Sequence, residues 1–412
     1  GSDIYDEGLL IPPCKLVDQG DINSLLLEIV KANSREPIAN EGDIYALIAC
    51  CEAGADRLIQ MMDEFQITDL KILSEYIIET SKQGTLSAIQ DLPKGTWKSV
   101  LRVDGYDAEI ELHAALTISE DGVLLDFAGT AGCNNKGINV PLNYATAYSV
   151  FALRCMIGSD IPNNAGSLEP FRVIAPKGCI LNAQPPAPVA MRHTLGQMTP
   201  DLVYGCLSQA LPDMVPAEGA SCMYDLPMRH TADAVDRGHT QFAVELVFNG
   251  GTGARPHLDG LSTTAFPSGV WGSQIETTEA VAPVIFHKRE LRTDSGGAGK
   301  YRGGLGQRIE VSSAIDQDFM VFLSVERILN PAEGRNGGHA GAAGRIRIGE
   351  NGSDIAGKGE LRVEHGKTLI FDTPGGGGFG DPSERDPEKM AFDLSAGVIS
   401  DAAARTVYGK RS

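Results

Sequence analysis

The chain has 412 residues, of which 42% are hydrophobic and 22% charged, and its mean hydropathy is close to zero. This length predicts two or three hydrophobic cores, and the composition is typical of a globular protein. The net charge of −19, from 35 basic and 54 acidic residues, argues against nucleic acid or an anionic membrane as the main partner. No apolar run is long enough to span a bilayer, and the first residues lack the features of a signal peptide.

All eight cysteines lie between Cys14 and Cys222, and none forms a C-x-x-C pair. Four of them occur in apolar helical patterns, at Cys50, Cys51, Cys155 and Cys206. We therefore expect reduced, buried thiols in a cytoplasmic protein.

An extended lead-in opens the chain, because Ile11-Pro-Pro-Cys14 does not allow a helix. Apolar residues then recur at helical spacing and predict three helices, at 22–33, 43–65 and 69–91. Pro93-Lys-Gly95 ends this helical section.

After residue 95 the pattern becomes mixed and then mainly β. Alternating residues and Asp-Gly turns predict strands, and two further stretches have helical spacing. The expected strands are 97–103, 108–118, 122–127, 171–175, 242–248, 281–291, 308–313, 319–325 and 367–371. The expected helices are 143–156, 195–211 and 387–394, with a last turn near Ala402. The predicted fold class is α+β, a helical N-terminal section followed by a β-rich, glycine-turn-rich body, divided into sections 1–95, 96–240 and 241–412.

A glycine-rich loop after the strand 242–248 is the first candidate site. Its backbone N–H groups, notably at Gly251 and Gly253, could cradle an anionic or carbonyl oxygen, with Arg255 supplying a fixed positive charge. His257 and Asp259 follow closely and are candidate catalytic groups. The alternative is a long hairpin connection whose polar residues satisfy their own backbone.

A second candidate cluster is Arg192-His193-Thr194, directly before a predicted helix. Thr194 could cap that helix, whose N-terminus would favour an anion; Arg192 would then bind substrate and His193 act as a base. A histidine at such a place is more often a simple hydrogen-bonding residue.

The stretch 290–307 contains six glycines among fixed charges, too many for a stable helix or an ordinary strand. Its Tyr301 and Arg302 are weaker candidates for substrate binding. The run Gly375–Gly380 formally fits G-x-G-x-x-G, but Asp381-Pro382 follows it in place of a helix, which favours a tight glycine turn packed on a neighbouring domain. The sequence has no G-x-S-x-G, no H-E-x-x-H and no complete phosphate-binding loop.

Several phrases, spread in order along the chain, resemble one family: the B-type subunits of hydantoinases and 5-oxoprolinases, with the metal-bearing subunits of acetone and acetophenone carboxylases. They are IYDEGLLIPPCKL from Ile4, DFAGTA from Asp126, GINVPL from Gly137, DIPNNAG from Asp160, LNAQPPA from Leu181, the loop 250–260, the stretch 289–307 and TPGGGGFGDP from Thr373. Two places differ from the family pattern. His193 stands where many members have Asn, and Thr264–Trp271 replaces a His-containing phrase, which weakens the case for a hydantoin or 5-oxoproline substrate.

The resemblance implies a divalent metal, but the family phrases that carry its His and Asp ligands precede the IYDEG segment and have no counterpart here. The chain therefore resembles the C-terminal portion of a B-type polypeptide, and its metal ligands are unknown. The resemblance also implies an ATP-hydrolysing A-type partner subunit, a missing N-terminal segment or chain of the B type, a small-molecule substrate and a hetero-oligomer.

Ring-opening hydrolysis of a cyclic amide is the leading hypothesis for the function. By resemblance, the partner uses ATP to phosphorylate a carbonyl or enol oxygen, which turns a poor electrophile into one with a good leaving group. Two alternatives stay open: a subunit of an ATP-dependent ketone carboxylase, and a non-catalytic scaffold subunit.

Overall fold

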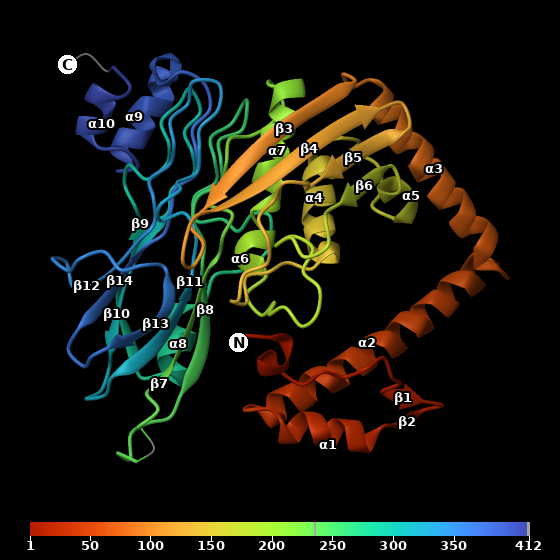
Figure 1. Cartoon of the computed structure of the whole chain (residues 1–412), viewed down its shortest axis with the longest axis horizontal. Coiled ribbons are helices and arrows are strands. Elements are labelled where there is room, and N and C mark those ends of the chain that lie inside the picture. The colour runs from red at the N-terminus through yellow and green to blue at the C-terminus, as the bar shows by residue number, and fades with distance from the viewer. Residues whose placement is uncertain (235, 410–412) are drawn as a thin grey trace.

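The computed structural model describes residues 1–234 and 236–409, and it is divided into a helical arm, a mixed section and a β-rich body (Figure 1). A short lead-in precedes the arm and consists of η1 (Ile4–Glu7), β1 (Val17–Asp18) and β2 (Asp21–Ile22). The lead-in is fixed to the mixed section, because the Ile4 N–H donates to the Pro186 carbonyl at 3.0 Å. The Glu7 carboxylate also accepts the Val189 N–H at 2.7 Å.

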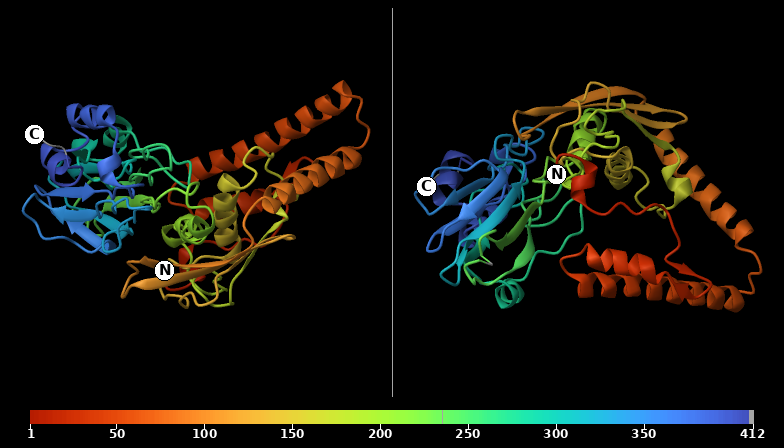
Figure 2. Two further views of the ribbon diagram at one scale, coloured as in Figure 1. Left: turned by 90° about the horizontal axis from the view of Figure 1, so that it is seen from above. Right: turned by 60° about the horizontal axis from the view of Figure 1, so that its bottom comes forward.

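Three helices form the arm: α1 (Ser24–Ala32), α2 (Pro37–Glu64) and α3 (Leu70–Gln90). They confirm the three helices expected from the apolar spacing. α2 begins six residues before its predicted start, since Pro37 suits a first helical turn, where its missing N–H costs nothing. Figure 2 shows α2 and α3 reaching away from the rest of the molecule.

The mixed section is built on a sheet of order β3-β4-β5-β6. Its strands are β3 (Gly95–Val103), β4 (Ile110–Ser119), β5 (Gly122–Asp126) and β6 (Phe171–Ile174). β3, β4 and β5 form an antiparallel meander, and β6 joins β5 in parallel after the helical crossover through α4 (Leu142–Met156) and α5 (Ala165–Leu168). Buried residues alternate strictly along β4, so one face of this sheet meets a core that α4 and α7 (Thr199–Ala210) cover.

One expected helix, 195–211, is two helices in the structure, α6 (His193–Gly196) and α7. The break falls at Gln197 and Met198, just before Thr199-Pro200. Pro200 has no N–H to continue the ladder from α6, whereas it suits the first turn of α7, where no such donor is needed.

Two four-stranded sheets face each other in the C-terminal body, in the orders β12-β14-β10-β9 and β13-β11-β7-β8. Their strands are β7 (Tyr224–His230), β8 (Ala243–Phe248), β9 (Val284–Leu291), β10 (Gln307–Ser313), β11 (Phe319–Ser324), β12 (Arg345–Ile348), β13 (Lys358–Val363) and β14 (Thr368–Asp372). Buried residues from both sheets share one hydrophobic cluster, so the body is a β-sandwich. The remaining elements are α8 (Ile275–Val281), η2 (Pro382–Glu384), α9 (Pro387–Ser395) and α10 (Asp401–Thr406).

The predicted α+β class is confirmed, and most expected strands are present. The sequence did not predict β7, β12 and β13. β7 carries Pro227 and several polar residues, so its sequence has little of the usual strand character, yet it pairs with β8 and β11. The boundary expected at residue 240 therefore falls between two paired strands. The predicted strand 281–291 loses its first residues to the end of α8.

The prediction that the cysteines are buried is wrong for some of them. Cys206 is buried and Cys155 half-buried, but Cys50 and Cys51 are exposed on α2, because nothing described packs on that part of the arm. Among the described helices none is both long and apolar enough to cross a membrane.

Glycine-rich segments pack backbone against backbone between the sandwich and the mixed section. We call them the glycine bundle, made of residues 249–254, 295–306, 333–344 and 373–380. Successive N–H groups of the segment 375–378 donate to three different parts of the chain, at the carbonyls of Ala342 and His339, Gly304, and Glu218, over 2.8–3.0 Å. A backbone that bonds in several directions in this way leaves no space for side chains between its segments.

Glycine is required in the bundle because of this close approach. A Cβ atom on Gly376 would overlap the Thr252 carbonyl, and one on Gly251 would overlap that of Gly304. The glycine turn predicted at 375–380 therefore packs on neighbouring segments, as expected.

We expect Gly376→Ala to destabilise the protein by about 3 kcal/mol or more, because backbone atoms on both sides must move to admit the methyl group. Gly54→Ala is the matched control: Gly54 has open space around it in the middle of α2, so Ala should be neutral or stabilise by about 1 kcal/mol. Urea unfolding of the two variants measures the difference, and equal stabilities would contradict this account of the bundle.

Candidate functional site

A cavity of about 350 Å³ lies where the mixed section meets the glycine bundle. α4, α7 and the segment 214–219 form one side, and the loop 252–256 with Leu261 and Phe266 forms the other. Its lining residues are Cys155, Met156, Asp201, Tyr204, Met214, Pro216, Ala217, Gly219, Thr252, Gly253, Arg255, Pro256, Leu261 and Phe266. Mostly apolar walls with a few polar groups are typical of small-molecule sites of this size.

Arg255 places a positive charge at this cavity. One of its terminal nitrogens, Nη2, donates to the Asp259 carbonyl at 2.9 Å, which holds the side chain in position. Its Nε is buried and has no hydrogen-bond partner in the described structure. Arg255 is the one basic residue among the described residues of the cavity lining, and a fixed positive charge there suits an oxygen atom of a bound molecule.

Asp201, which the sequence did not predict as a site residue, lies at the same cavity and is fully buried. Its carboxylate accepts hydrogen bonds from the Ser221 hydroxyl at 2.7 Å and from Arg327 at 2.8 Å. Burial pushes the pKa of Asp201 upward, and the Arg327 guanidinium opposes this rise. Arg327 also pairs with Glu218 at 3.0 Å, so this polar cluster links α7 to the sandwich.

Asp259 and Arg302 belong to an ion-pair network beside the cavity. The Asp259 carboxylate accepts two hydrogen bonds from Arg385, at 2.9 and 3.0 Å, and one from the Arg302 N–H at 2.7 Å. Both arginines also bind the buried carboxylate of Asp393. Burial alone would raise the pKa of Asp259, but its hydrogen bonds to Arg385 hold it below the ordinary value. The carboxylate groups are thus occupied in holding α9 to the loops.

The other residues predicted for the first site have different surroundings. Gly253 lines the cavity, whereas Gly251 is buried inside the glycine bundle. His257 is exposed on the loop after Pro256. Tyr301 forms a β-bridge with Phe379, and Lys389 lies over its ring at 5.2 Å.

Arg192 and His193 do not line the cavity. Arg192 lies over the ring of Tyr144 at 5.7 Å. His193 begins α6, and its Nε2 is 3.6 Å from Oδ2 of Asp225 on β7. The structure therefore separates the two predicted clusters: Arg255 is at the cavity, and His193 is beside the sandwich.

His193 and Asp225 form a buried pair with displaced pKa values. Burial lowers the pKa of His193 to about 4. Burial and the neighbouring charge of Glu245 raise the pKa of Asp225 to about 7. The His193 Nε2 and the Asp225 Oδ1 are both buried without a hydrogen-bond partner among the described residues.

No metal site can be built from the residues that the structure describes. Across 1–234 and 236–409, no group of three or more His, Cys, Asp and Glu side chains is arranged to hold an ion. The donor set of this part of the chain therefore does not fit the metal that the resemblance implies.

Comparison with known proteins gives consistent matches along the chain. Residues 1–382 match the family model described as hydantoinase B/oxoprolinase. An uncharacterized protein of Methanocaldococcus jannaschii, MJ0963, is 31% identical over 98% of this chain and 71% of its own length. The B-type subunit of a putative D-/L-hydantoinase from Pseudomonas sp. (strain NS671) is 29% identical over 99% of this chain and 71% of its own. The crystal structure of ATP-dependent caprolactamase from Pseudomonas jessenii superposes with a TM-score of 0.86 at 25% identity, covering 98% of this chain and 72% of the other.

Arg385→Met should destabilise the protein by about 3–5 kcal/mol, because it leaves Asp259 without its cation and takes one of two cations from buried Asp393. Arg345→Met is the control: Arg345 pairs with Asp354 at the surface, so its loss should cost less than about 1 kcal/mol. Chemical unfolding measures both, and a small effect of the Arg385 change would show that the network contributes little.

Asp225→Asn should make stability rise more steeply with pH than in the parent. In the parent, Asp225 has a folded pKa of about 7 against an ordinary value of 3.8, so it favours the native state at low pH, and this contribution is lost as pH rises from about 4 to 7. An Asn at this position does not titrate, so the variant lacks this loss of stability with rising pH. His193 acts in the opposite sense, with a contribution that is lost as pH falls from 6.5 to about 4. Unfolding curves at pH 4–8 measure the difference, with Asp56→Asn on exposed α2 as control; parallel curves for the Asp225 variant and the parent would refute the displaced pKa.

Proposed function

Because this chain belongs to the hydantoinase B/oxoprolinase family, we propose that it forms part of the B-type catalytic subunit of an ATP-dependent, ring-opening cyclic-amide hydrolase. The family includes relatives named as hydantoinase and caprolactamase subunits. The observation that carries the proposal for this chain is the apolar cavity with Arg255 as the one basic residue in its described lining.

In this proposal the cavity binds the substrate ring. Met156, Met214 and Phe266 contact its hydrocarbon part, and Arg255 donates to the oxygen of the amide carbonyl or of its phosphorylated form. A resonance-stabilised amide is a poor electrophile, and phosphorylation of its oxygen by ATP activates the carbonyl carbon for the attack of water. The C–N bond of the adduct then breaks, the ring nitrogen leaves as an amine, and a second water hydrolyses the resulting acyl phosphate to carboxylate and phosphate. Arg255 then stabilises negative charge on that oxygen or on the phosphate.

The apolar walls favour a lactam whose ring is largely hydrocarbon over a hydantoin, which carries a second amide nitrogen and carbonyl. Asp201 does not supply a partner for these extra groups, since Arg327 and Ser221 already occupy its carboxylate. His257 extends from the same loop as Arg255 and is a candidate for a mobile acid–base group at the cavity entrance. His193, Asp259, Arg192, Gly251, Tyr301 and Arg302 remain candidates with positioning roles.

The proposed partner is an A-type subunit that hydrolyses ATP, in a cytoplasmic hetero-oligomer. The family metal would bind outside the described part of the chain, because no suitable donor set exists within it. When bound, such a metal supplies charge stabilisation or an activated water. The residues of this chain bind and orient the ring.

The decisive experiment measures ADP release with the A-type subunit present and three substrates: a simple lactam, a hydantoin, and a ketone with bicarbonate. We expect turnover with the lactam and no dependence on bicarbonate. Bicarbonate-dependent turnover of the ketone would overturn the hydrolase in favour of a carboxylase.

Arg255→Met should lower kcat/KM for the lactam at least 10-fold, because it removes a charge-assisted hydrogen bond to the reacting group. The control, Arg405→Met, changes an exposed arginine on α10 and should leave the rate as in the parent. Assembly with the A-type subunit, measured by sedimentation, should be intact in both variants. Full activity of the Arg255 variant in an intact complex would favour a scaffold role for this chain.

A further inference from the structure

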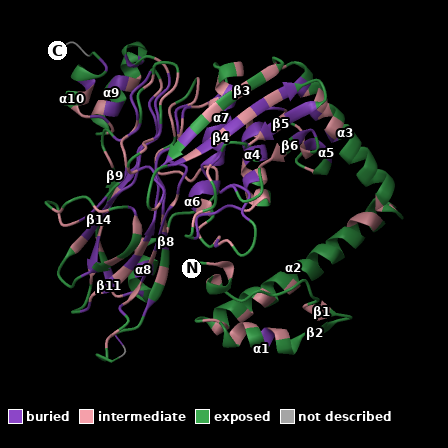
Figure 3. Ribbon diagram, viewed as in Figure 1, coloured by how far each residue is buried: buried purple, intermediate pink, exposed green. Residues whose placement is uncertain are grey.

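The arm exposes apolar side chains that a folded protein normally covers. Every residue of 51–60 on α2 and of 71–80 on α3 is exposed, as the green colour of both helices shows in Figure 3. Ile59, Ile72 and Tyr76 are 58%, 76% and 69% exposed. Single exposed apolar residues need no explanation, but two long helices with uncovered apolar faces indicate an interaction surface.

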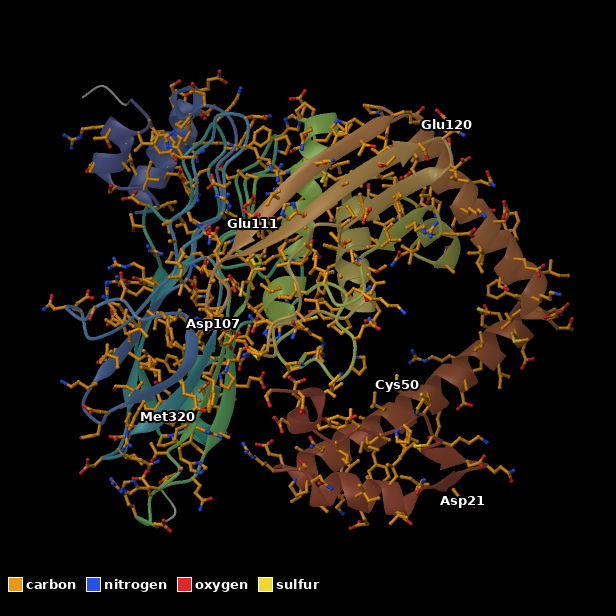
Figure 4. The ribbon with its side chains drawn as sticks, viewed as in Figure 1. Asp21, Cys50, Asp107, Glu111, Glu120 and Met320 are labelled. Carbon is orange, nitrogen blue, oxygen red and sulfur yellow. The ribbon has the colours of Figure 1, made fainter. Side chains whose placement is uncertain are left out.

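Along α2 the apolar residues form a continuous stripe, which Ile59 flanks; within it Ile44, Ile48 and Met62 are half-buried and the others are exposed. Apolar or small residues recur along α2 with the alternating spacing of four and three that marks a helix-packing seam, at Ile44, Ile48, Cys51, Ala55, Leu58, Met62 and Phe65. Charged and polar residues, including Asp56, Arg57 and Gln60, lie on the opposite side. α1 is the one described element that packs extensively on α2, and it reaches only the first part of the helix (Figure 4, in which Cys50 marks the middle of α2).

A helix of this length without tertiary cover is only marginally stable in water, since most helical stability in proteins comes from packing of an apolar face. The arm is nevertheless a shared feature of the fold. The superposition on caprolactamase covers 98% of this chain, and the 2% left out is shorter than α2 alone, so the caprolactamase chain has the arm as well.

The same superposition indicates what covers the stripe. It accounts for 72% of the caprolactamase chain, so 28% of that chain (100 − 72) lies outside the part shared with this protein. The two curated relatives are matched over 71% of their length in the same way. A polypeptide of that size needs a surface to pack on, and the exposed apolar residues of α2 and α3 offer one.

We propose that the stripe on α2 and the adjoining face of α3 dock the remaining segment of the family fold, an apolar-faced polypeptide equivalent to that additional quarter of the relatives. The docking buries Leu58 and Ile59 on α2 and Tyr76 on α3, and this burial stabilises both helices. This goes beyond the proposed reaction, because it assigns a protein-binding surface on the arm. The assignment does not depend on which substrate the cavity binds.

The test uses the full chain and the polypeptide from the same organism that matches the relatives' remaining quarter, produced together. Hydrogen exchange should slow at least 10-fold at the amides of 51–60 and 71–80 in the complex, because docking suppresses local opening of the helices. The triple variant Leu58→Glu, Ile59→Glu, Tyr76→Glu should bind at least 100-fold more weakly.

The matched control places three carboxylates on the opposite faces of the same helices, with Ala53→Glu, Gln60→Glu and Ser74→Glu, and should bind as the parent does. Circular dichroism of each free variant checks that the helices persist. Binding of the triple variant at parental affinity would overturn the proposal, as would a complex in which the arm stays unprotected. Protection of the arm by self-association of the chain alone, seen by sedimentation, would assign the stripe to a second copy and also overturn it.

Discussion

Close contact between backbones in the glycine bundle is the constraint on which the positions of the other parts depend. The segment 375–378 donates to three separate segments, and these come from both sides of the junction between the mixed section and the sandwich. Because no Cβ fits between them, the segments approach more closely than strands joined only at their edges. The loop that carries Arg255 starts inside this bundle, at Gly251, and leaves it at the cavity. The bundle therefore fixes the position of the guanidinium, and its Thr252 and Gly253 form part of the cavity wall.

The glycine pattern singled out these loops, but it did not show whether they bind a ligand or pack against other segments. A glycine-rich stretch is expected both where backbone N–H groups hold a ligand and where chains pack too closely for side chains, and composition alone does not separate the two. For Gly251 and Gly376 the structure shows packing, whereas Gly253 also faces the cavity. Helices were predicted well because their apolar periodicity is local. β7, with Pro227 and its polar neighbours, was not predicted because its pairing with β8 and β11 is decided by partners elsewhere in the chain.

In the candidate site, too, contacts between residues far apart in the sequence could not be predicted. Arg255 was predicted because it stands in a distinctive loop, but Asp201 was not. Asp201 meets Arg327 only through the fold, from 126 residues away, and no local pattern joins them. Asp259 was predicted as a catalytic group from its neighbours in sequence, yet its carboxylate is held by Arg385, 126 residues further on. Contacts between distant charges decide which carboxylate is free to react and which one supports the loops.

Apolar surface occurs in two distinct settings in this chain, and the difference bears on how the protein works. In the cavity it is concave, encloses about 350 Å³ and has one guanidinium group, that of Arg255, among the described residues of its lining. On the arm it is convex and follows the seam of a long helix, a form that a small molecule cannot cover but a protein segment can. α4 borders the cavity through Cys155, and its exposed Phe151, one turn earlier on the same face, lies beside the ring of Phe266 in the cavity wall. The concave surface thus suits a small ring, as proposed for the cavity, and the convex one suits a polypeptide, as proposed for the arm.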